Sequence, residues 1–321
     1  MDIQKIIEIC GDKKVYIQTH NFPDPDAIGS AYGLKQLLKE YGIETLICHE
    51  GQVDKLSVRK LTEKCDIEIF SHDEIKDNLK EEDIIILVDS QKNSGNTTDI
   101  IGEEAICIDH HPTFVDVEYR YKDIRKVGAC ASIIADYYRE LGLKPDPNTA
   151  TAMLYGIKMD TLQFQRGVTP FDIEMFGFLF EYCDHDKLSD LESNNMEFSD
   201  LQAYGTAIEN ISVYDYVGFS YIDYHCPDAM IAILSDFILS LVEVEVVIIY
   251  AKRNNGYKFS VRSERDDIHA GELANKVLSK YGNGGGHAFM AGGFVPEDRI
   301  AELGNYPMDV IRNDFLAEIQ G

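Results

Sequence analysis

The sequence predicts an α/β protein with an N-terminal doubly wound, mostly parallel sheet and a smaller C-terminal α/β domain. Three observations lead to this prediction. Short apolar runs alternate with amphipathic helical patterns up to about residue 185, the chain then becomes polar, and a second set of strand patterns follows. The length of 321 residues is sufficient for two ordinary domains. We place the first domain at residues 1–187, a helical linker at 188–212 and the second domain at 213–321.

The strands and helices of the first domain alternate along the chain, which favours parallel pairing of the strands. Gly42 and Gly142 lie just beyond two of the helical patterns, where a helix commonly ends on glycine, and Thr169-Pro170 combines a cap with a first-turn proline. We predict strands at 14–19, 44–48, 66–70, 83–89 and 105–109, and helices at 27–41, 129–141, 147–157 and 170–183.

The second domain contains three apolar runs that predict strands and one amphipathic run that predicts a helix. Two of the strands are separated by Arg253-Asn-Asn-Gly256, and the Asn-Gly pair in this segment favours positive φ and a hairpin. The most glycine-rich segment of the chain follows the helix. The predicted strands are 218–224, 245–252 and 257–262, the helix is 270–281, and the glycine-rich segment is 282–293.

The composition, with 45% hydrophobic and 27% charged residues, is typical of a globular protein. Seven cysteines are an odd number and include no Cys-x-x-Cys pair, so we expect reduced, partly buried thiols. The longest apolar block, residues 230–250, contains three acidic residues, and the N-terminus lacks the pattern of a secretory signal. We therefore expect no membrane span and a cytoplasmic protein.

The net charge of −26 and the isoelectric point of about 4.6 argue against binding of long duplex nucleic acid, because such binding depends on neutralising many phosphates. A short phosphorylated substrate is compatible with this charge, since bound divalent cations would offset part of it. The sequence leaves a homodimer open.

One acidic, histidine-bearing cluster follows the strand at 14–19 and contains His20, Asp24 and Asp26. Open α/β sheets build their sites at the carboxyl ends of parallel strands. Gly29-Ser30 comes next, at the start of a helix whose free N–H groups favour an anion. The loop can therefore hold a cation together with a phosphate. An acidic surface turn that caps the helix is the alternative.

A second cluster, Asp109-His110-His111, follows the strand at 105–109 in a chain with only 9 histidines. Asp89 ends the strand at 83–89, where a charge has no packing role, and Asp160 follows an apolar helix. Either aspartate alone could be a helix cap. Taken with both clusters, they predict metal-ligand chemistry at the strand ends.

These motifs, in this order, resemble the DHH phosphoesterase family, which is named for the Asp-His-His that stands here at 109–111. The resemblance extends to the C-terminal half, which is similar to the DHHA1 domain, and it points to the oligoribonuclease and 3′-phosphoadenosine-5′-phosphate phosphatase group. The motifs that carry it are His20-x-x-x-Asp24-x-Asp26, Asp89, Asp109-His110-His111, Asp160-Thr161, Phe259-Ser-Val-Arg262-Ser263 and Gly284-Gly-Gly-His287.

The resemblance implies a centre of two cations bridged by Asp89, with Mn²⁺ as the expected ion and Mg²⁺ or Co²⁺ as alternatives. It also implies a catalytic role for Asp89 and for His111, which we expect beside a phosphate oxygen or the leaving group. The implied ligands are His20, Asp24 and Asp89 for one ion, and Asp26, Asp89, His110 and Asp160 for the other.

The DHHA1 resemblance implies that the second domain binds the substrate. A guanidinium such as that of Arg262 grips phosphate with two parallel hydrogen bonds, and we expect the glycines to offer backbone N–H groups as an anion nest. Leu162 stands where glycine is common in the family, and Phe164 either stacks on a base or packs in the core. The implied substrate contacts are Arg262, Ser263, Gly284, Gly285, Gly286 and His287.

We therefore expect a Mn²⁺-dependent hydrolase that cleaves short oligonucleotides (nanoRNA and linear dinucleotides), nucleoside 3′,5′-bisphosphate, or both, by attack of a hydroxide. Hydrolysis of pyrophosphate or short polyphosphate is one alternative. A nucleotide-binding regulatory protein with little turnover is another.

Overall fold

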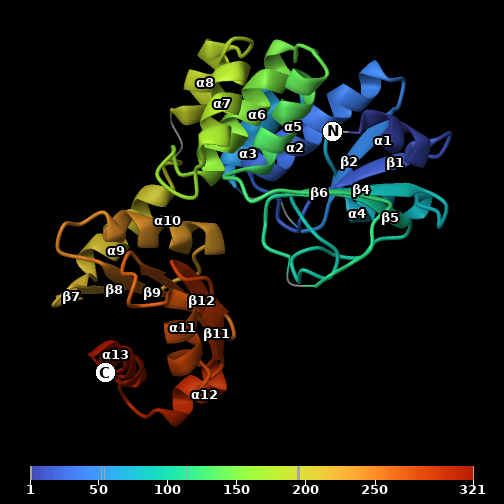
Figure 1. Ribbon diagram of the computed structural model, residues 1–321. Helices are drawn as coiled ribbons and strands as arrows, with labels where there is room; N and C mark the ends of the chain where they lie inside the picture. The colour runs from blue at the N-terminus through green and yellow to red at the C-terminus, as the bar shows by residue number, and fades with distance from the viewer. Residues whose placement is uncertain (1, 52, 54, 114, 194–195, 321) are drawn as a thin grey trace. The chain divides into compact units, whose positions relative to one another are not determined.

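The structure is a computed structural model that describes residues 2–51, 53, 55–113, 115–193 and 196–320. It divides into two compact units, Met1–Asn195 and Met196–Gly321 (Figure 1). Helix α8 (His185–Glu192) belongs to the first unit and α9 (Asp200–Glu209) to the second. The division thus falls inside the segment 188–212, whose role as a linker stays a prediction.

The first unit is built on a six-stranded sheet in which every strand pair is parallel, in the order β3-β2-β1-β4-β5-β6. The chain runs from β1 outward to one edge and then from β4 outward to the other, so the order reverses between these two strands. This confirms the predicted doubly wound sheet. The strands are β1 Val15–Gln18, β2 Thr45–His49, β3 Phe70–Ser71, β4 Ile84–Val88, β5 Glu103–Asp109 and β6 Tyr121–Ile124.

The two faces of this sheet are covered unequally. Alternate strand residues such as Ile17 and Ile86 join a large core with most of the helices, whereas Tyr16 and Leu87 join a small core beneath α4. Figure 1 shows the helices of the first unit gathered mainly on one side of the sheet. Besides α8, the helices are α1 Ile3–Cys10, α2 Pro25–Glu40, α3 Leu56–Lys64, α4 His72–Ile75, α5 Cys130–Glu140, α6 Pro147–Asp160 and α7 Pro170–Phe180, with a 3₁₀ turn at Lys76–Asn78.

The sequence did not predict every element of the first unit. Helices α1, α3 and α4 and strand β6 were missed; α4 is a single turn, and the edge strand β6 carries charged residues. The strand predicted at 66–70 is wrong for its first four residues: Asp66 takes a positive φ of 53°, and only β3 pairs with β2. Helix α2 begins earlier than predicted because Asp24 caps it, accepting hydrogen bonds from the N–H groups of Asp26 and Ala27.

The second unit is a six-stranded sheet in the order β11-β12-β10-β9-β8-β7, antiparallel except for the β8–β9 pair. Helices α9 and α10 pack on one face, and α11, α12 and α13 pack on the other. The strands are β7 Ser212–Tyr214, β8 Val217–Ile222, β9 Val246–Arg253, β10 Gly256–Ser263, β11 Asn283–Gly286 and β12 Met290–Pro296, and the remaining helices are α10 Asp228–Leu239, α11 Ala270–Leu278, α12 Glu297–Glu302 and α13 Pro307–Gln320.

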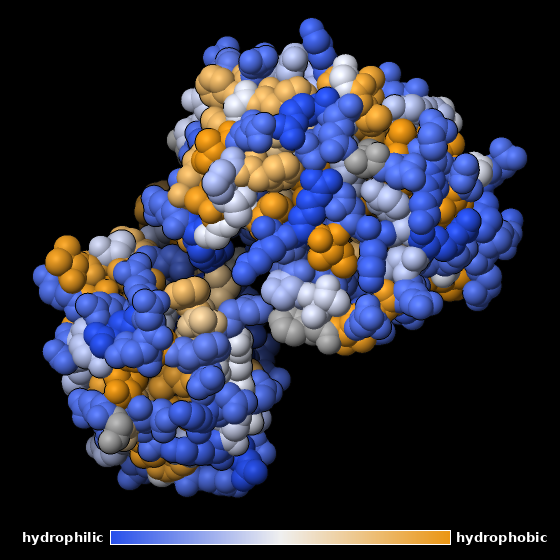
Figure 2. Space-filling model, in the orientation of Figure 1, coloured by the Kyte–Doolittle hydropathy of each residue, from blue (hydrophilic) through white to orange (hydrophobic). Residues whose placement is uncertain are grey.

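The predicted hairpin joins β9 to β10, and the positive φ at its turn falls on Gly256. The glycine-rich segment is not an irregular loop, since β11 pairs with β12 along its length. All seven cysteines are buried and free, as predicted. Among the described residues, no helix is long and apolar enough to span a membrane. On the face drawn in Figure 2, hydrophilic residues cover most of both units and apolar residues form small groups.

Helices α2 and α6 touch backbone to backbone. A Cβ atom added to Gly29 would lie 2.5 Å from the carbonyl oxygen of Ala152, and one added to Gly156 would lie 3.0 Å from the Cα of Asp26. Neither contact leaves room for a methyl group. The spacing of these helices therefore depends on glycine at both positions.

Replacing Gly29 by alanine is expected to lower the free energy of unfolding by about 1–3 kcal/mol, because the helices must separate to admit the methyl group. Urea denaturation measures the effect. Gly177→Ala in α7 is the matched control, since a Cβ there meets nothing within 4 Å and alanine favours helix by up to about 1 kcal/mol. Equal stability of the two variants would refute the packing argument.

Candidate metal centre

The predicted metal ligands lie together at the carboxyl end of the parallel sheet. His20 and Asp24 follow β1, Asp89 follows β4, and His110 follows β5. Two helices complete the group, because Asp26 lies in the first turn of α2 and Asp160 is the last residue of α6. The strand order reverses between β1 and β4, which is where open α/β sheets form their binding crevice.

Asp89 lies between two sets of candidate ligands, which are His20 and Asp24 on one side and Asp26, His110 and Asp160 on the other. Its Oδ2 lies 3.7 Å from His20 Nε2, which is also 3.9 Å from Asp24 Oδ1. Its Oδ1 lies 3.2 Å from His110 Nε2. His110 Nε2 in turn lies 3.3 Å from Asp160 Oδ2 and 4.0 Å from Asp26 Oδ2. The two carboxylate oxygens of Asp89 thus face different sets, as a bridging ligand requires.

Both histidines of these sets are oriented by the backbone. His20 Nδ1 lies 2.8 Å from the carbonyl oxygen of Asn21, and His110 Nδ1 lies 3.1 Å from that of Val127. An Nδ1–H donated to a carbonyl leaves Nε2 with its lone pair, which is the usual arrangement of a metal-binding histidine. In both residues Nε2 is the atom that faces the aspartates.

Two buried polar atoms at the centre lack hydrogen-bond partners. Asp89 Oδ1 lies 3.2 Å from the buried Nε2 of His110, but the two atoms form no hydrogen bond and neither has another partner, although Asp89 is only 2% exposed. Buried polar atoms are seldom left unsatisfied, and a bound ion is one of the accepted explanations. Asp89 also has a positive φ of 56°, a strained conformation of the kind that clusters at functional sites. These residues therefore fit divalent cations.

The electrostatics of the cluster favour positive charge. Burial by itself lowers the pKa of His20, but Asp24 and Asp89 raise it to about 9. Burial acts in the same way on His110, whose pKa is raised to about 11 by Asp89, Asp26 and Asp160. Burial and neighbouring carboxylates raise the pKa of Asp26 and of Asp160. Cations bound here would relieve the repulsion among these carboxylates.

Asp26 is held by the start of helix α5. Its Oδ2 accepts a hydrogen bond from the N–H of Cys130 at 2.7 Å, and its Oδ1 accepts one from that of Ala131 at 3.0 Å. Asp172, which is fully buried, holds the preceding turn by accepting from the N–H of Gly128 at 2.8 Å. Neither contact was predicted, because the partners are 44 or more residues apart in sequence.

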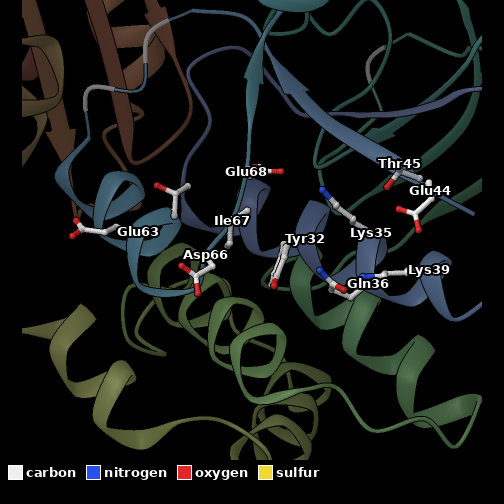
Figure 3. Close-up of a pocket in the computed structure, with 11 residues that line it drawn as sticks. Tyr32, Lys35, Gln36, Lys39, Glu44, Thr45, Glu63, Asp66, Ile67 and Glu68 are labelled. Carbon is white, nitrogen blue, oxygen red and sulfur yellow. The ribbon is translucent and has the colours of Figure 1, made fainter.

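A separate hollow of about 670 Å³ lies at the amino end of β2, between α2 and the end of α3 (Figure 3). It contains none of the predicted ligands. Acidic residues outnumber lysines four to two along it, but its lining includes no histidine. These residues are Lys35, Lys39, Glu44, Glu63, Asp66 and Glu68. The strand-end cluster is therefore the better candidate for the functional site.

Two family models match the chain. The model of the DHH family, N-terminal domain, matches residues 14–157, and that of the DHHA1 domain matches residues 214–306. The chain belongs to the DHH phosphoesterase family. The DHH match contains every predicted metal ligand except Asp160, which lies three residues beyond its end.

Several relatives are similar to this chain over most of its length. The protein MJ1633 of Methanocaldococcus jannaschii is 28% identical over 87% of this chain, which spans only 57% of that protein. The bifunctional oligoribonuclease and PAP phosphatase NrnA of Thermus thermophilus is 29% identical over 87% of this chain and 83% of its own length. A probable manganese-dependent inorganic pyrophosphatase of Clostridium acetobutylicum is 26% identical over 64% of this chain and 66% of its own length.

The same DHH–DHHA1 fold is found in a solved structure, an exopolyphosphatase-related protein from Bacteroides fragilis. Its TM-score is 0.75, with 18% sequence identity and 97% of each chain covered. At this identity the similarity describes the fold alone.

The first residue of the DHH motif orients the third. Asp109 is fully buried, and its Oδ1 lies 2.9 Å from His111 Nδ1 and accepts the N–H of His110 at 2.8 Å. Gln91 Nε2 donates to Asp109 Oδ2 at 2.6 Å. The His111 side chain is 47% exposed, in contrast to the other site histidines. Burial lowers the pKa of His111, but Asp109 raises it above the ordinary value.

Replacing Asp109 by asparagine is expected to lower kcat about 10–100-fold, because the carboxylate that orients His111 is lost. Steady-state kinetics of the variant and of His111→Ala test this. The double variant should lose no more activity than His111→Ala alone, since Asp109 acts through His111. If the double variant instead shows the product of the two single losses of activity, Asp109 does not act through His111.

Residues after Asp160 take an unusual backbone path in this DHH domain. Leu162, Gln163 and Phe164 have φ values of 46°, 56° and 67°, which explains why glycine would suit position 162. Phe164 packs edge-on against Phe176 with ring centroids 4.9 Å apart, next to the large core. Of the two roles considered for Phe164, the structure supports core packing.

The predicted substrate residues of the DHHA1 domain gather at one end of its sheet. Arg262 and Ser263 end β10, His287 begins the turn after β11, and the N–H of Ser263 donates to the carbonyl of Phe289 at 3.1 Å. Arg262 is partly engaged, because its Nε donates to Asp236 at 2.7 Å. The sequence did not indicate this ion pair.

The glycines of this DHHA1 segment have a packing role, and the expected anion nest stays a prediction. Gly284 and Gly285 belong to strand β11, which pairs with β12. A Cβ on Gly284 would lie 2.4 Å from the carbonyl oxygen of Ala274 in α11, and one on Gly286 would lie 2.6 Å from that of Met290. A Cβ on Gly285 meets nothing within 4 Å. Only Gly285 has open space beside it.

Proposed function

We propose that this protein is a manganese-dependent phosphoesterase that hydrolyses short oligonucleotides, linear dinucleotides, nucleoside 3′,5′-bisphosphate, or a combination of these. The observation that carries the proposal is the position of Asp89, whose two carboxylate oxygens face two different sets of candidate ligands. This arrangement is what a centre of two bridged cations requires.

The proposed ligands divide between the two sets. His20, Asp24 and Asp89 would hold one ion, and Asp26, Asp89, His110 and Asp160 the other. Mixed carboxylate and imidazole ligands suit Mn²⁺, with Mg²⁺ or Co²⁺ as alternatives. Two such ions would supply a water of lowered pKa as the nucleophile and would offset charge on the attacked phosphate.

His111 is the proposed catalytic side chain that faces the substrate. It is half exposed, its Nδ1 is held by Asp109, and its Nε2 is therefore free to donate a proton to the leaving oxygen. The raised pKa of His111 favours the protonated form that this step needs. The proposal includes no covalent enzyme intermediate, because an activated water suffices as the nucleophile.

The DHHA1 residues proposed to bind the substrate are Arg262, Ser263, Gly284, Gly285, Gly286 and His287. Arg262 can still offer its Nη2 to a phosphate, since Nε contacts Asp236 and Nη1 contacts Ser260 and Val261. The similarity to a named oligoribonuclease and PAP phosphatase over 87% of this chain supports a nucleotide substrate. A cytoplasmic location and a homodimer stay predictions.

The test is a substrate panel with the purified full chain in Mn²⁺. We expect mononucleotide release from a 5′-phosphorylated dinucleotide, or orthophosphate release from nucleoside 3′,5′-bisphosphate, at rates well above those for pyrophosphate and tripolyphosphate. Faster hydrolysis of pyrophosphate would replace the proposal by the pyrophosphatase alternative, which the Clostridium acetobutylicum relative supports. Tight dinucleotide binding without product over hours would favour the regulatory alternative.

A further inference from the structure

Phe22 combines two properties that folding alone does not explain. It lies between His20 and Asp24 in the first metal-binding motif, and 61% of its surface is exposed. Its φ is 55°, in the left-handed region that glycine or asparagine would occupy at lower cost. An exposed phenyl ring buries little apolar surface in return. Strained residues of this kind cluster at functional sites.

The backbone around Phe22 is fixed on both sides. The N–H of Phe22 donates to the carbonyl of Glu50 at 2.9 Å, and that of Asn21 donates to the carbonyl of Asn96 at 2.7 Å. The Asn21 side chain also exchanges two hydrogen bonds with Thr98, at 3.0 and 3.1 Å. Two different loops therefore hold this segment, and the ring is presented from a fixed position.

Gly51 supports one side of the ring. A Cβ added to Gly51 would lie 2.7 Å from two carbons of the Phe22 ring, so the ring lies directly against this glycine. Gly51 itself has a φ of 83°. Any other residue at position 51 would push the ring away. One side of the phenyl group is thus covered by backbone, and the remainder is available to a ligand.

We propose that Phe22 is the stacking surface of a nucleobase subsite beside the metal centre. The inference rests on the proposed function and deepens it, because it assigns the base of a nucleotide substrate to a particular side chain. Aromatic rings bind bases of any sequence by stacking, which suits a phosphoesterase for short oligonucleotides. Pyrophosphate has no apolar part, so an exposed ring at this place would not increase its binding affinity. Phe164, the other aromatic residue considered, packs at the core instead.

The test compares two phosphorylated ligands that differ only in the base. Binding of AMP and of ribose 5-phosphate to the full chain in Mn²⁺ is measured by isothermal titration calorimetry. We expect the wild type to bind AMP at least roughly tenfold more tightly, a ratio within the range for one stacked base. Phe22→Asn should remove most of this preference without changing the affinity for ribose 5-phosphate, and Phe22→Tyr should retain it.

Thermal unfolding shows whether the variant is folded. Asparagine tolerates positive φ, so Phe22→Asn should unfold at the same or a higher temperature than the wild type. Ile101→Asn is the matched control, an exposed apolar side chain before the amino end of β5, and it should leave both affinities unchanged. An unchanged AMP preference in Phe22→Asn, or the lack of any preference in the wild type, would overturn the inference. Base-dependent binding through Phe22 without hydrolysis would overturn only the proposed function.

Discussion

Replacing Asp89 by asparagine is expected to reduce kcat for every phosphoester substrate by roughly a thousandfold or more, because the proposed bridging carboxylate is lost. Asparagine keeps the shape of the side chain and tolerates the φ of 56°, so the loss should come from the missing charge. Kinetics with the preferred substrate of the panel measure it. Asp66→Asn is the matched control, because exposed Asp66 has a similar φ of 53° and lies outside the centre.

The same variant should also lose its response to metal. At a Mn²⁺ concentration a thousandfold above Kd, one ion stabilises the folded wild type by about 4 kcal/mol. In EDTA the variant also lacks the ion pairs of Asp89 with His20 and His110, so each protein is compared with its own metal-free form. Differential scanning calorimetry with EDTA and with Mn²⁺ measures the stabilisation of each protein. A full Mn²⁺ stabilisation of the variant would show that Asp89 is not a ligand.

Replacing Asp172 by alanine is expected to lower the free energy of unfolding by about 3 kcal/mol, because several buried donors lose their acceptor together. Asp172 Oδ2 accepts the N–H groups of Gly128 and Thr169 and the Thr169 hydroxyl, at 2.6–2.8 Å. Its Oδ1 accepts the Ser132 hydroxyl at 2.6 Å. Urea denaturation of the metal-free protein measures the loss.

The comparison for Asp172 is Asp184→Ala. Asp184 caps α8 by accepting the N–H groups of Asp186 and Lys187, and removal of such a cap costs about 1 kcal/mol. A loss at Asp172 no larger than at Asp184 would contradict the argument. Because the turn that Asp172 holds leads to the N–H groups that bind Asp26, Asp172→Ala should also weaken Mn²⁺ binding, which calorimetric titration would detect.

The sequence was most informative where chemistry and topology coincide. Histidines and aspartates directly after apolar runs indicated a site at the strand ends, and parallel topology then requires those ends to meet at one edge of the sheet. His20, Asp89 and His110 lie together for this reason. The fold class followed from the same alternation of strand and helix patterns.

What the sequence missed depends on long-range contacts. The ion pair of Arg262 with Asp236, and the hydrogen bonds of Asp172 that span 40 and 44 residues, leave no local pattern. The pairing of the glycines of β11 with β12 was not predicted, because the packing of α11 against that strand cannot be read from composition. The exposure of Phe22 likewise depends on Gly51, which lies on a different loop.

The contact between α2 and α6 has a consequence for the ions themselves. Asp26 belongs to the first turn of one helix and Asp160 to the last turn of the other, and the glycines at 29 and 156 let the two backbones touch between them. The spacing of the two helix ends that carry these carboxylates is therefore set by main-chain contact. If cations bind here as proposed, a fixed spacing would favour some ionic radii over others. Calcium needs longer bonds and more ligands than manganese or magnesium, so we expect it to bind more weakly than either.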